Sequence, residues 1–367
     1  MENLARTYSN AGVDTEEEDL AMEKIKPILK ETFKNRKGLI GESLLQEIKH
    51  YAAIVKITDQ IAVAFKTDGV GTKTFIAQYM NKYDTVGIDC VAMNINDIIC
   101  TGAEPTSFLD YLAVQKSDPY LIEEIGKGLR KGADMAKVSI VGGETAIMPD
   151  MINGVPEKIG FDLAGSAIGT LNPNRIIDGS LIEEGDALMG ISSSGIHSNG
   201  LTLARNIFCD EKNFLLNTYF EELGHTIGEE LLKPTYIYVD EIMEIIKSGI
   251  RLKVLAHITS NGLLNLRRIG KDFGYRITNI PKPHPIYNLI KNYGNVPITE
   301  MYEVYNMGVG MCAVLSQEQL DSALSIVEKH QKKAFVMGKA VRDPQQNIKI
   351  ETENLRIISK GNKFTEF

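Results

Sequence analysis

Residues 60–73 read QIAVAFKTDGVGTK, and this stretch carries the strongest structural signal in the chain. Its first half, Gln60 to Lys66, alternates in the manner of a β-strand. The strand runs into Thr67-Asp68-Gly69-Val70-Gly71-Thr72-Lys73, where two glycines let the backbone approach a ligand and successive N–H groups can surround phosphate oxygens. The loop matches neither GxxxxGK[ST] nor GxGxxG, and a tight turn with solvated Asp68 and Lys73 is the alternative interpretation. We therefore expect a strand that ends in a phosphate-binding loop.

Strands and helices alternate on both sides of this loop, which predicts an α/β (α+β) chain. Further strands are expected at 138–141, where the strand is short and buried, and at 161–169, 186–192 and 251–258. Helices are expected at 19–33, 87–101, 201–208 and 235–247, and another begins at Asp118-Pro119 with Asp118 as its N-cap. The stretch 171–185 is rich in Asn, Pro, Gly and charged residues, which favours a domain boundary near Thr170. Two domains are thus predicted, 1–170 and 171–367.

The composition is that of a globular protein with a core of ordinary size, since 43% of the 367 residues are hydrophobic and 24% are charged. The 40 Lys and Arg residues against 48 Asp and Glu residues give a net charge of −8, which argues against nucleic acid or anionic lipid as the main partner. The four cysteines form no CxxC pair, and there is no run of about 18 apolar residues. The polar, acidic N-terminus is unlike a signal peptide. We expect a reduced, cytoplasmic, soluble protein.

A polar face lies on the predicted helix 87–101 (GIDCVAMNINDIICT). Asn94 and Asp97 fall at i and i+3, with Asn96 beside them, on a helix that is otherwise apolar. Such groups are costly to bury unless they are paired or meet a ligand, so this face either reaches water or forms part of a site. A carboxylate here and Asp68 on the preceding loop could together bind Mg²⁺, which takes one or two protein carboxylates and phosphate oxygens.

The second half carries a polar loop, SSSGIHSNG at 192–200, between a predicted strand and a predicted helix. Ser198 or Asn199 is expected to cap the helix, whose N-terminus attracts anions. His197 is a candidate general acid or base, or a hydrogen-bond donor to a developing negative oxygen. A loop that only caps the helix is the alternative interpretation.

Two strand ends carry weaker candidates. Glu144 leaves a predicted buried strand beside Gly142 and Gly143, and a carboxylate in that position has few purely structural explanations. His257 lies near the end of the predicted strand 251–258, where a buried structural histidine is the more common finding.

A series of motifs follows in a fixed order along the chain. Its members are Ala11-Gly12-Val13-Asp14, Thr67-Asp68-Gly69-Val70-Gly71-Thr72-Lys73, Asn96-Asp97 with Gly102-Ala103-Glu104-Pro105, Asp110-Tyr111, Gly142-Gly143-Glu144-Thr145-Ala146 with Met148-Pro149, Ser194-Gly195 with His197-Ser198-Asn199-Gly200, and Gly308-Val309-Gly310-Met311. This series resembles the phosphoribosylformylglycinamidine cyclo-ligase family, also called aminoimidazole ribonucleotide synthetase. The resemblance runs from Tyr8 to Val341 and is most specific in the first half and around His197.

The resemblance implies a homodimer in which each chain has two domains. Strands of the two N-terminal domains would form a barrel across the dimer interface, and the C-terminal domain would be an α/β sandwich-like unit. It also implies ATP and magnesium, with formylglycinamidine ribonucleotide as the small-molecule substrate. The formyl oxygen would be phosphorylated to an imidate phosphate, and a nitrogen of the same molecule would then close the imidazole ring and expel phosphate. Because an amide oxygen leaves poorly until it is phosphorylated, the protein's tasks are positioning and charge neutralisation.

The resemblance also assigns roles to particular residues. Asp68 and Asp97 would bind magnesium. The residues that bind the nucleotide would be Lys26, Gly69, Gly71, Thr72, Lys73 and Asn96. The substrate would be bound by Ser194, Gly195, Ser198 and Asn199, and the catalytic residues would be His197, Lys73 and Glu144.

Two stretches depart from the family pattern and leave other functions open. Thr259-Ser260-Asn261-Gly262 stands where a threonine and three glycines are usual, and 38–45 (GLIGESLL) replaces a glycine-rich segment that contains phenylalanine. Both changes reduce backbone freedom near the expected phosphate pocket. A thiamine monophosphate kinase-like enzyme of the same superfamily is one alternative, and a non-catalytic nucleotide-binding regulator is another. Such a regulator would be expected to lack Asp68, Asp97 or Lys73, and all three are present.

Overall fold

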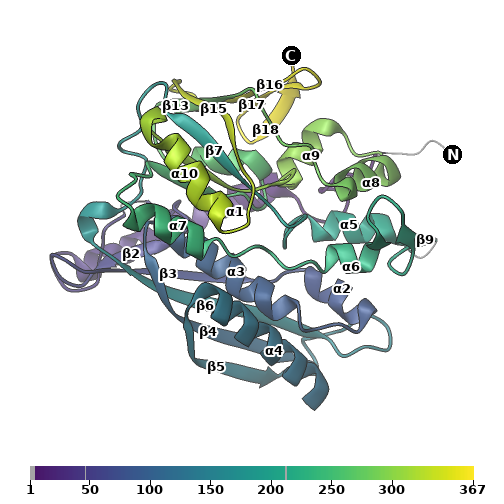
Figure 1. The fold of residues 1–367 in the computed structure, drawn as a ribbon. Helices are drawn as coiled ribbons and strands as arrows, with labels where there is room; N and C mark the ends of the chain where they lie inside the picture. Colours follow the sequence, from purple (N-terminus) through teal and green to yellow (C-terminus); the bar gives the residue numbers. More distant parts are fainter. Residues whose placement is uncertain (1–4, 46, 211–212) are drawn as a thin grey trace.

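The computed structural model describes residues 5–45, 47–210 and 213–367, and Figure 1 shows its two large sheets. The first sheet is formed by the N-terminal half. Its strand order is β1 (Glu42–Ser43), β2 (Ala53–Lys56), β3 (Ala62–Gly69), β6 (Phe161–Leu171), β4 (Glu104–Val114), β5 (Ser139–Ile147). Neighbouring strands are antiparallel except β4 and β5, which are parallel. The prediction of a mixed sheet is therefore confirmed.

The second sheet has eight strands, all from the C-terminal half. Their order is β12 (Val254–His257), β14 (Val309–Leu315), β7 (Ala187–Ser192), β15 (Ala334–Arg342), β13 (Phe273–Ile277), β16 (Ile348–Glu351), β17 (Arg356–Lys360), β18 (Lys363–Glu366). This sheet is antiparallel apart from the parallel pair β13 and β16. Two small two-stranded sheets pair β8 (Cys209–Asp210) with β9 (Asn213–Phe214) and β10 (Tyr219–Phe220) with β11 (His225–Thr226).

Helices pack on both sheets, which confirms a mixed α/β chain with two structural halves (Figure 1). The N-terminal half contains α1 (Thr15–Lys30), η1 (Glu31–Arg36), α2 (Lys73–Met80), α3 (Val86–Ile99) and α4 (Pro119–Ala136). The link and the C-terminal half contain η2 (Pro173–Arg175), α5 (Leu201–Phe208), α6 (Ile227–Leu231), α7 (Val239–Lys247), η3 (Gly262–Arg268), α8 (Pro285–Gly294), α9 (Ile298–Val304) and α10 (Gln317–Lys329). The first sheet ends at Leu171 and the second begins at Ala187; the division into 1–170 and 171–367 stays a prediction. No helix in the described ranges is both long and apolar enough to cross a membrane.

Helix α3 lies at the centre of the molecule, and every one of its residues is buried. One side packs on β3, β6 and α4, and the other meets α7 and β12 of the second half (Figure 1). A glycine makes the close approach to α4 possible, since a Cβ at Gly87 would lie 2.3 Å from the backbone nitrogen of Leu129. The polar side chains of α3 are therefore buried; Asp89, Asn96 and Asp97 bind residues of the second half, whereas Asn94 donates to the Asp68 carbonyl of β3.

Several local predictions hold in the structure. The strand expected at 60–66 is β3, which continues through Asp68 to Gly69, so the first part of the expected loop is still paired. Helix α4 begins as expected, because the Asp118 carboxylate accepts a hydrogen bond from the Leu121 N–H at 3.0 Å. Helix α5 has the expected bounds, Leu201–Phe208.

Three local predictions are wrong. The helix expected at 235–247 begins only at Val239, because the backbone N–H groups of Thr235 and Tyr238 donate to side chains of α3. Neither serine nor asparagine caps α5; its N-cap is Gly200, in the left-handed region at φ 69°. The strand expected to be buried at 138–141 is β5, an edge strand whose residues are exposed apart from the half-buried Ala146.

Two apolar surfaces are uncovered in the single chain. On the face of the first sheet opposite α3, Phe65 and Tyr111 are each 42% exposed, and Val141 at the sheet edge is 61% exposed. Helix α1 also exposes apolar side chains, with Ile28 at 66% and Leu20 at 51%. Monomeric proteins rarely leave apolar area of this kind uncovered, so these surfaces favour an interface.

Candidate active site

Two carboxylates of the N-terminal half converge on one ammonium group. Asp68 comes from β3 and Asp97 from α3, and the Lys66 Nζ lies 3.2 Å from the Asp68 Oδ2 and 2.7 Å from the Asp97 Oδ2. The structure thus brings the two predicted metal ligands together, with a lysine between them. Among the described residues, no group of three or more His, Cys, Asp and Glu side chains is placed to bind a metal.

Asp97 is also bound from the second half of the chain. Its Oδ1 lies 2.9 Å from the Nδ1 of His257, a fully buried residue of β12. Burial alone would raise the pKa of Asp97, but the charges and hydrogen bonds of Lys66 and His257 outweigh it and hold this pKa below its usual value. Asp97 is therefore a permanent anion at neutral pH, and both of its oxygens have partners.

Asn96 joins the two halves rather than facing open space. Its amide nitrogen donates to the Tyr236 carbonyl at 2.8 Å, and its side-chain oxygen accepts from the Tyr238 N–H at 3.1 Å. Both bonds go to the extended segment that precedes α7. The expected role of Asn96 in nucleotide binding stays a prediction, while the structure shows it as an interdomain tie.

Lys73 also joins the two halves of the chain. Its side chain and that of Asp89 on α3 have no exposed surface, and Nζ lies 2.8 Å from the Asp89 Oδ2. The remaining donors go to the carbonyls of His197 at 3.3 Å and Lys233 at 2.6 Å. Burial lowers the pKa of Lys73, and Asp89 opposes that shift. Two hydrogen bonds to carbonyls and the ion pair with Asp89 hold the fully buried ammonium, which has no surface open to a phosphate in this arrangement. Its contact with the nucleotide stays a prediction.

The other residues of the predicted nucleotide loop lie at the end of β3 and just before α2. Gly71 adopts φ 70°, a conformation that favours glycine, and the Gly69 N–H donates to Asp68 at 2.9 Å. The Thr72 hydroxyl lies 3.0 Å from that of Thr202 on α5. The loop therefore contacts the helix that follows the second-half loop 192–200.

His197 occupies the centre of that second-half loop, 1% exposed and in the left-handed region at φ 60°. Its Nε2 accepts from the Ser194 N–H at 3.2 Å, which places the ring proton on Nδ1 in the neutral form. Burial, with the nearby charges of His257, Lys73 and His284, holds the pKa of His197 well below its usual value. The Nδ1 has no hydrogen-bond partner in the described part of the chain, and it is buried in this arrangement.

The residues around His197 are held by hydrogen bonds from several elements. The Ser194 hydroxyl donates to the Pro234 carbonyl at 2.6 Å, and the Gly195 carbonyl accepts from Tyr287 and Asn306. The Ser198 hydroxyl lies 3.3 Å from that of Thr235. The loop is therefore rigid, and it contacts the segment that also binds α3.

The departures at Ser260 and Asn261 fit this arrangement. Asn261 adopts φ 72°, and asparagine is one of the residues other than glycine that enters this region readily. The Ser260 hydroxyl donates to the side-chain oxygen of Asn199 at 3.1 Å. The stretch that replaces a glycine run thus keeps a left-handed backbone and adds a contact to the loop of His197.

Two predicted site residues lie apart from this cluster. Glu144 is on the exposed edge strand β5, separated from β3 by β6 and β4, and is exposed. Lys26 is on α1, whose surface is largely exposed. In one chain, neither is brought to Asp68 and Asp97 by any contact in the structure.

Three residues of the cluster were missed by the motifs, namely Lys66, Asp89 and Thr235. Lys66 carried a signal, because a charged residue stands at an inward position of an apolar strand pattern. Asp89 lies in the first turn of the apolar helix α3, where an unpaired carboxylate would be costly. Thr235, whose N–H and hydroxyl both donate to Asp89 at 2.7 Å, gave no signal.

Comparison with known proteins finds relatives that span both halves of the chain. Family models described as AIR synthase related protein match residues 49–171 for the N-terminal domain and 183–351 for the C-terminal domain. The phosphoribosylformylglycinamidine cyclo-ligase of Methanothermobacter thermautotrophicus is 47% identical over 88% of this chain and 91% of its own length. The cyclo-ligase of Thermococcus kodakarensis is 44% identical over 96% of this chain and 99% of its own length. The chain belongs to the phosphoribosylformylglycinamidine cyclo-ligase family.

Solved structures show the same fold at low sequence identity. Thiamine-monophosphate kinase from Stenotrophomonas maltophilia aligns with a TM-score of 0.59 and 16% identity over 88% of this chain and 95% of its own. The HypE–HypF complex gives a TM-score of 0.59, 18% identity and coverage of 85% and 93%. T. maritima PurL complexed with ATP gives a TM-score of 0.54 and 14% identity. That alignment covers 89% of this cyclo-ligase family member and 47% of the PurL chain. At these identities the likeness establishes the fold alone.

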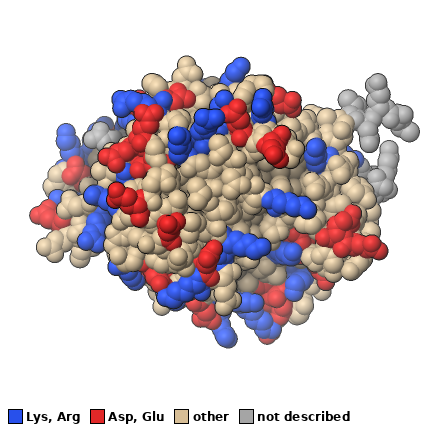
Figure 2. Space-filling view, turned by 45° about the horizontal axis from the view of Figure 1, so that its top comes forward, with Lys and Arg blue, Asp and Glu red and all other residues tan. Residues whose placement is uncertain are grey.

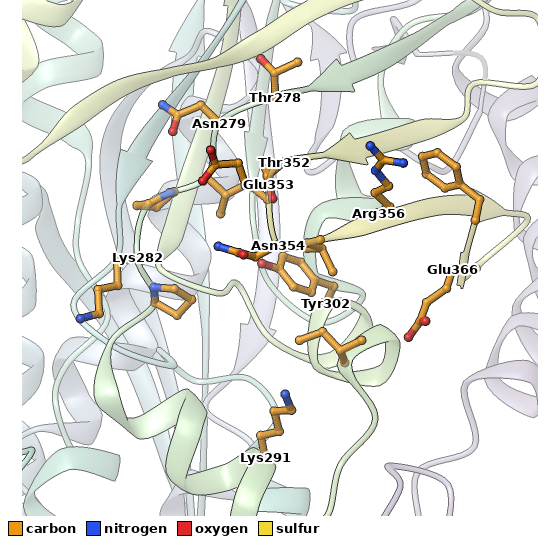
Figure 3. Close-up of a pocket in the computed structure, with 16 residues that line it drawn as sticks. Thr278, Asn279, Lys282, Lys291, Tyr302, Thr352, Glu353, Asn354, Arg356 and Glu366 are labelled. Carbon is orange, nitrogen blue, oxygen red and sulfur yellow. The ribbon is translucent and has the colours of Figure 1, made fainter.

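A cavity of this family member lies away from the cluster. It has a volume of about 760 Å³ and lies in the C-terminal half, between the segment 278–283, helices α8 and α9, and the end of the chain (Figure 3). Lys291 points into it, and Arg356 and Glu366 stand at its other side. None of the predicted site residues lines this cavity.

Proposed function

We propose that the protein catalyses the ATP-dependent ring closure of formylglycinamidine ribonucleotide to aminoimidazole ribonucleotide, with release of ADP and phosphate. The observation that carries this proposal is the 47% identity to a phosphoribosylformylglycinamidine cyclo-ligase over 88% of the chain. Identity at this level over both domains favours the same reaction rather than only the same fold.

The reaction needs two steps on one substrate. The formyl oxygen attacks the terminal phosphorus of ATP, the adjacent formamide nitrogen loses its proton, and ADP leaves. The amidine nitrogen that carries the ribose then attacks the formyl carbon, loses its proton and displaces the oxygen as part of phosphate. Both steps are intramolecular or between bound groups, so the protein contributes mainly by positioning and by neutralising charge.

The carboxylates of Asp68 and Asp97 are proposed to hold magnesium. Their chemistry fits, because they are hard oxygen donors that already converge on one cation, the Lys66 ammonium. Bound there, magnesium would neutralise charge on the nucleotide phosphates. Gly69, Gly71 and Thr72 are proposed to line those phosphates, and PurL, which shares the fold, has been solved with ATP.

Lys26, Lys73 and Asn96 are retained as proposed nucleotide contacts. Lys73 would need to leave Asp89 and the two carbonyls to reach a phosphate, since its side chain is fully buried among them. Lys26 is on the largely exposed helix α1, and this helix would need to move toward Asp68 and Asp97 for Lys26 to contact a nucleotide there. Asn96 could act on a nucleotide only by holding the adjacent Asp97 in position.

His197 is the proposed catalytic residue of the second half. A neutral imidazole with an unpartnered Nδ1–H can donate to the formyl oxygen as charge develops on it. Ser194, Gly195, Ser198 and Asn199 are proposed to bind the ribonucleotide beside it. The proposed catalytic role of Glu144 requires a second chain, because its own chain places it on a distant edge strand.

A homodimer is the proposed assembly. The exposed side chains of Phe65 and Tyr111 lie on one face of the first sheet, and the edge strand β5 has a free side. Pairing of two such sheets would cover these surfaces and is consistent with the barrel expected for the family.

The proposed location is the cytoplasm, and the proposed partners exclude nucleic acid and membranes. The four cysteines are free in the structure, which suits a reducing compartment. On the face seen in Figure 2, acidic and basic side chains are interspersed, and the chain as a whole carries −8. This charge distribution is unlike that of proteins that bind polyanions.

The decisive experiment supplies purified protein with ATP, Mg²⁺ and formylglycinamidine ribonucleotide, and follows ADP and the imidazole product together. Thiamine monophosphate replaces the ribonucleotide in the matched control, since a thiamine-monophosphate kinase shares the fold. ADP formation only with the ribonucleotide supports the proposal. ADP formation with thiamine monophosphate, or with neither, would contradict it.

A further inference from the structure

Lys66 is the residue that joins the two carboxylates, and no sequence motif assigned it a role. It stands two residues before Asp68 on β3, so both side chains leave the strand on the same face, toward α3. Its ammonium is 2.7 Å from one oxygen of Asp97 and 3.2 Å from one oxygen of Asp68. A single positive charge thus bridges β3 and α3, which the Asn94 amide also joins by donating to the Asp68 carbonyl at 3.1 Å.

Lys66 is the cation of both ion pairs, and its side chain is mostly buried between the two carboxylates, with 18% exposed. One ammonium balances half of the charge of the two carboxylates, so the group as a whole keeps a net charge of −1.

This position is also where a divalent ion would have to bind. An ion ligated by both carboxylates would sit about 2.1 Å from their oxygens, between the same two groups that the ammonium now bridges. Two cations cannot share that point, because their repulsion at such short separation is large in a partly buried site. Metal binding and the present position of Lys66 therefore exclude each other.

We propose that Lys66 is a built-in counterion, which holds Asp68 and Asp97 together in the metal-free protein and is displaced when a divalent metal binds. This inference rests on the magnesium site of the proposed function. It implies that the site binds free Mg²⁺ weakly, and that the ion binds well only when nucleotide phosphates supply further ligands and accept the displaced ammonium.

The structure leaves room for this displacement. The Lys66 side chain is 18% exposed, and the residue lines a cavity of about 210 Å³ together with His50, Tyr51 and Thr67. Long lysine side chains reach new partners by rotating about several bonds, without movement of the strand. Lys73 differs in this respect, since it is fully buried and its three donors have partners.

The test measures Mn²⁺ binding by electron paramagnetic resonance in the absence of nucleotide, with Mn²⁺ as the paramagnetic substitute for Mg²⁺. Lys66→Met removes the charge and keeps an unbranched side chain that is one atom shorter. Lys56→Met is the matched control, because Lys56 lies on the adjacent strand β2 and pairs with Asp59 at the surface. Lys66→Arg keeps the charge and tests the same idea in a variant that retains both ion pairs.

The expected result is Mn²⁺ affinity at least tenfold higher in Lys66→Met than in the wild type and in Lys56→Met. Lys66→Arg should bind Mn²⁺ no more tightly than the wild type. Mg²⁺ should also raise the melting temperature of Lys66→Met more than that of the wild type. Unchanged or weaker Mn²⁺ binding by Lys66→Met, or tighter binding by Lys66→Arg, would overturn the role of Lys66. Failure of every variant to bind Mn²⁺, with or without ADP, would instead reject the metal site itself.

Discussion

Lys73 and Asp89 form an ion pair in which neither side chain has exposed surface, and 2.8 Å separates Nζ from Oδ2. The other Asp89 oxygen accepts two hydrogen bonds from Thr235, and the lysine also donates to the His197 carbonyl. Lys73, a residue of the proposed nucleotide loop, is thereby tied to both second-half segments that surround the proposed substrate site. The pair therefore links the loop that ends at Lys73 in the first half to the segments around His197 and Thr235 in the second half.

Asp89→Asn is predicted to destabilise the protein by about 3–5 kcal/mol, because it leaves the Lys73 ammonium buried without a counterion. Chemical denaturation measures the loss. Glu124→Gln is the control, since its pair with Lys127 is on the surface and such pairs contribute at most about 1 kcal/mol. If Asp89→Asn has normal stability, the ion pair does not stabilise the fold as predicted. Loss of ATP turnover in that stable variant would show that Lys73 acts on the phosphates instead.

Asp97→Asn is predicted to abolish ATP turnover and also to lower stability, since Asp97 is buried between Lys66 and His257. A carboxyl group with a lowered pKa stabilises the fold above the pKa of the unfolded chain, about 3.9, and this contribution is lost as the pH falls through the folded value. The difference in unfolding free energy between wild type and variant should therefore be constant from pH 7 to pH 5 and shrink below about pH 4. A free-energy difference that increases as the pH falls would contradict a stabilising ionised Asp97.

His197→Asn is predicted to reduce imidazole formation about a hundredfold, or about 3 kcal/mol, with little effect on ATP binding. Asparagine tolerates the left-handed φ of 60° at this position, so the backbone should be retained. Full specific activity of the folded variant would reject the proposed donor role.

The same variant tests the protonation state of His197. A histidine with a lowered folded pKa is neutral in the fold, so the unfolded chain takes up a proton first as the pH falls below about 6.5, and stability decreases. The stability advantage of the wild type over His197→Asn should shrink by up to about 1.4 kcal/mol per pH unit between pH 6.5 and pH 5.5. An advantage that increases over this interval would show a histidine that is charged in the fold.

Val141→Lys is predicted to convert a homodimer into a species of the 40.6 kDa chain mass. Val141 is 61% exposed on the edge strand β5, and a charge there would be buried on pairing with a second sheet. Sedimentation velocity measures the change. Tyr219→Lys is the control, because Tyr219 is equally exposed but lies in the second half. Wild-type protein that already sediments as a single chain at micromolar concentration would refute the dimer.

The elements that could be predicted from the sequence are those that depend on residues close together in the chain. Alternation predicted β3, and the Asp118-Pro119 pair predicted the start of α4, because strand pairing and capping depend on neighbouring residues. The late start of α7 could not be predicted, since it results from bonds that Thr235 and Tyr238 make to α3. Helix propensity is a weak influence beside buried hydrogen bonds of that kind.

The candidate site was predicted in its parts but not in its contacts. Asp68 and Asp97 were expected together, and they converge on one cation. The sequence left open whether the polar face of α3 meets water or a ligand, and the structure shows that Asn96 and Asp97 bind the second half. Such partners are distant in sequence, so spacing within the helix cannot reveal them.

The central claim, ring closure through a phosphorylated formyl oxygen, is tested most directly by isotope transfer. Formylglycinamidine ribonucleotide labelled with oxygen-18 in its formyl group is turned over with unlabelled ATP and Mg²⁺, and the phosphate is analysed by mass spectrometry. If the formyl oxygen attacks the terminal phosphorus and leaves on phosphate, each phosphate formed carries one labelled oxygen, in equal amount to the imidazole. Imidazole formation with unlabelled phosphate would contradict the proposed mechanism.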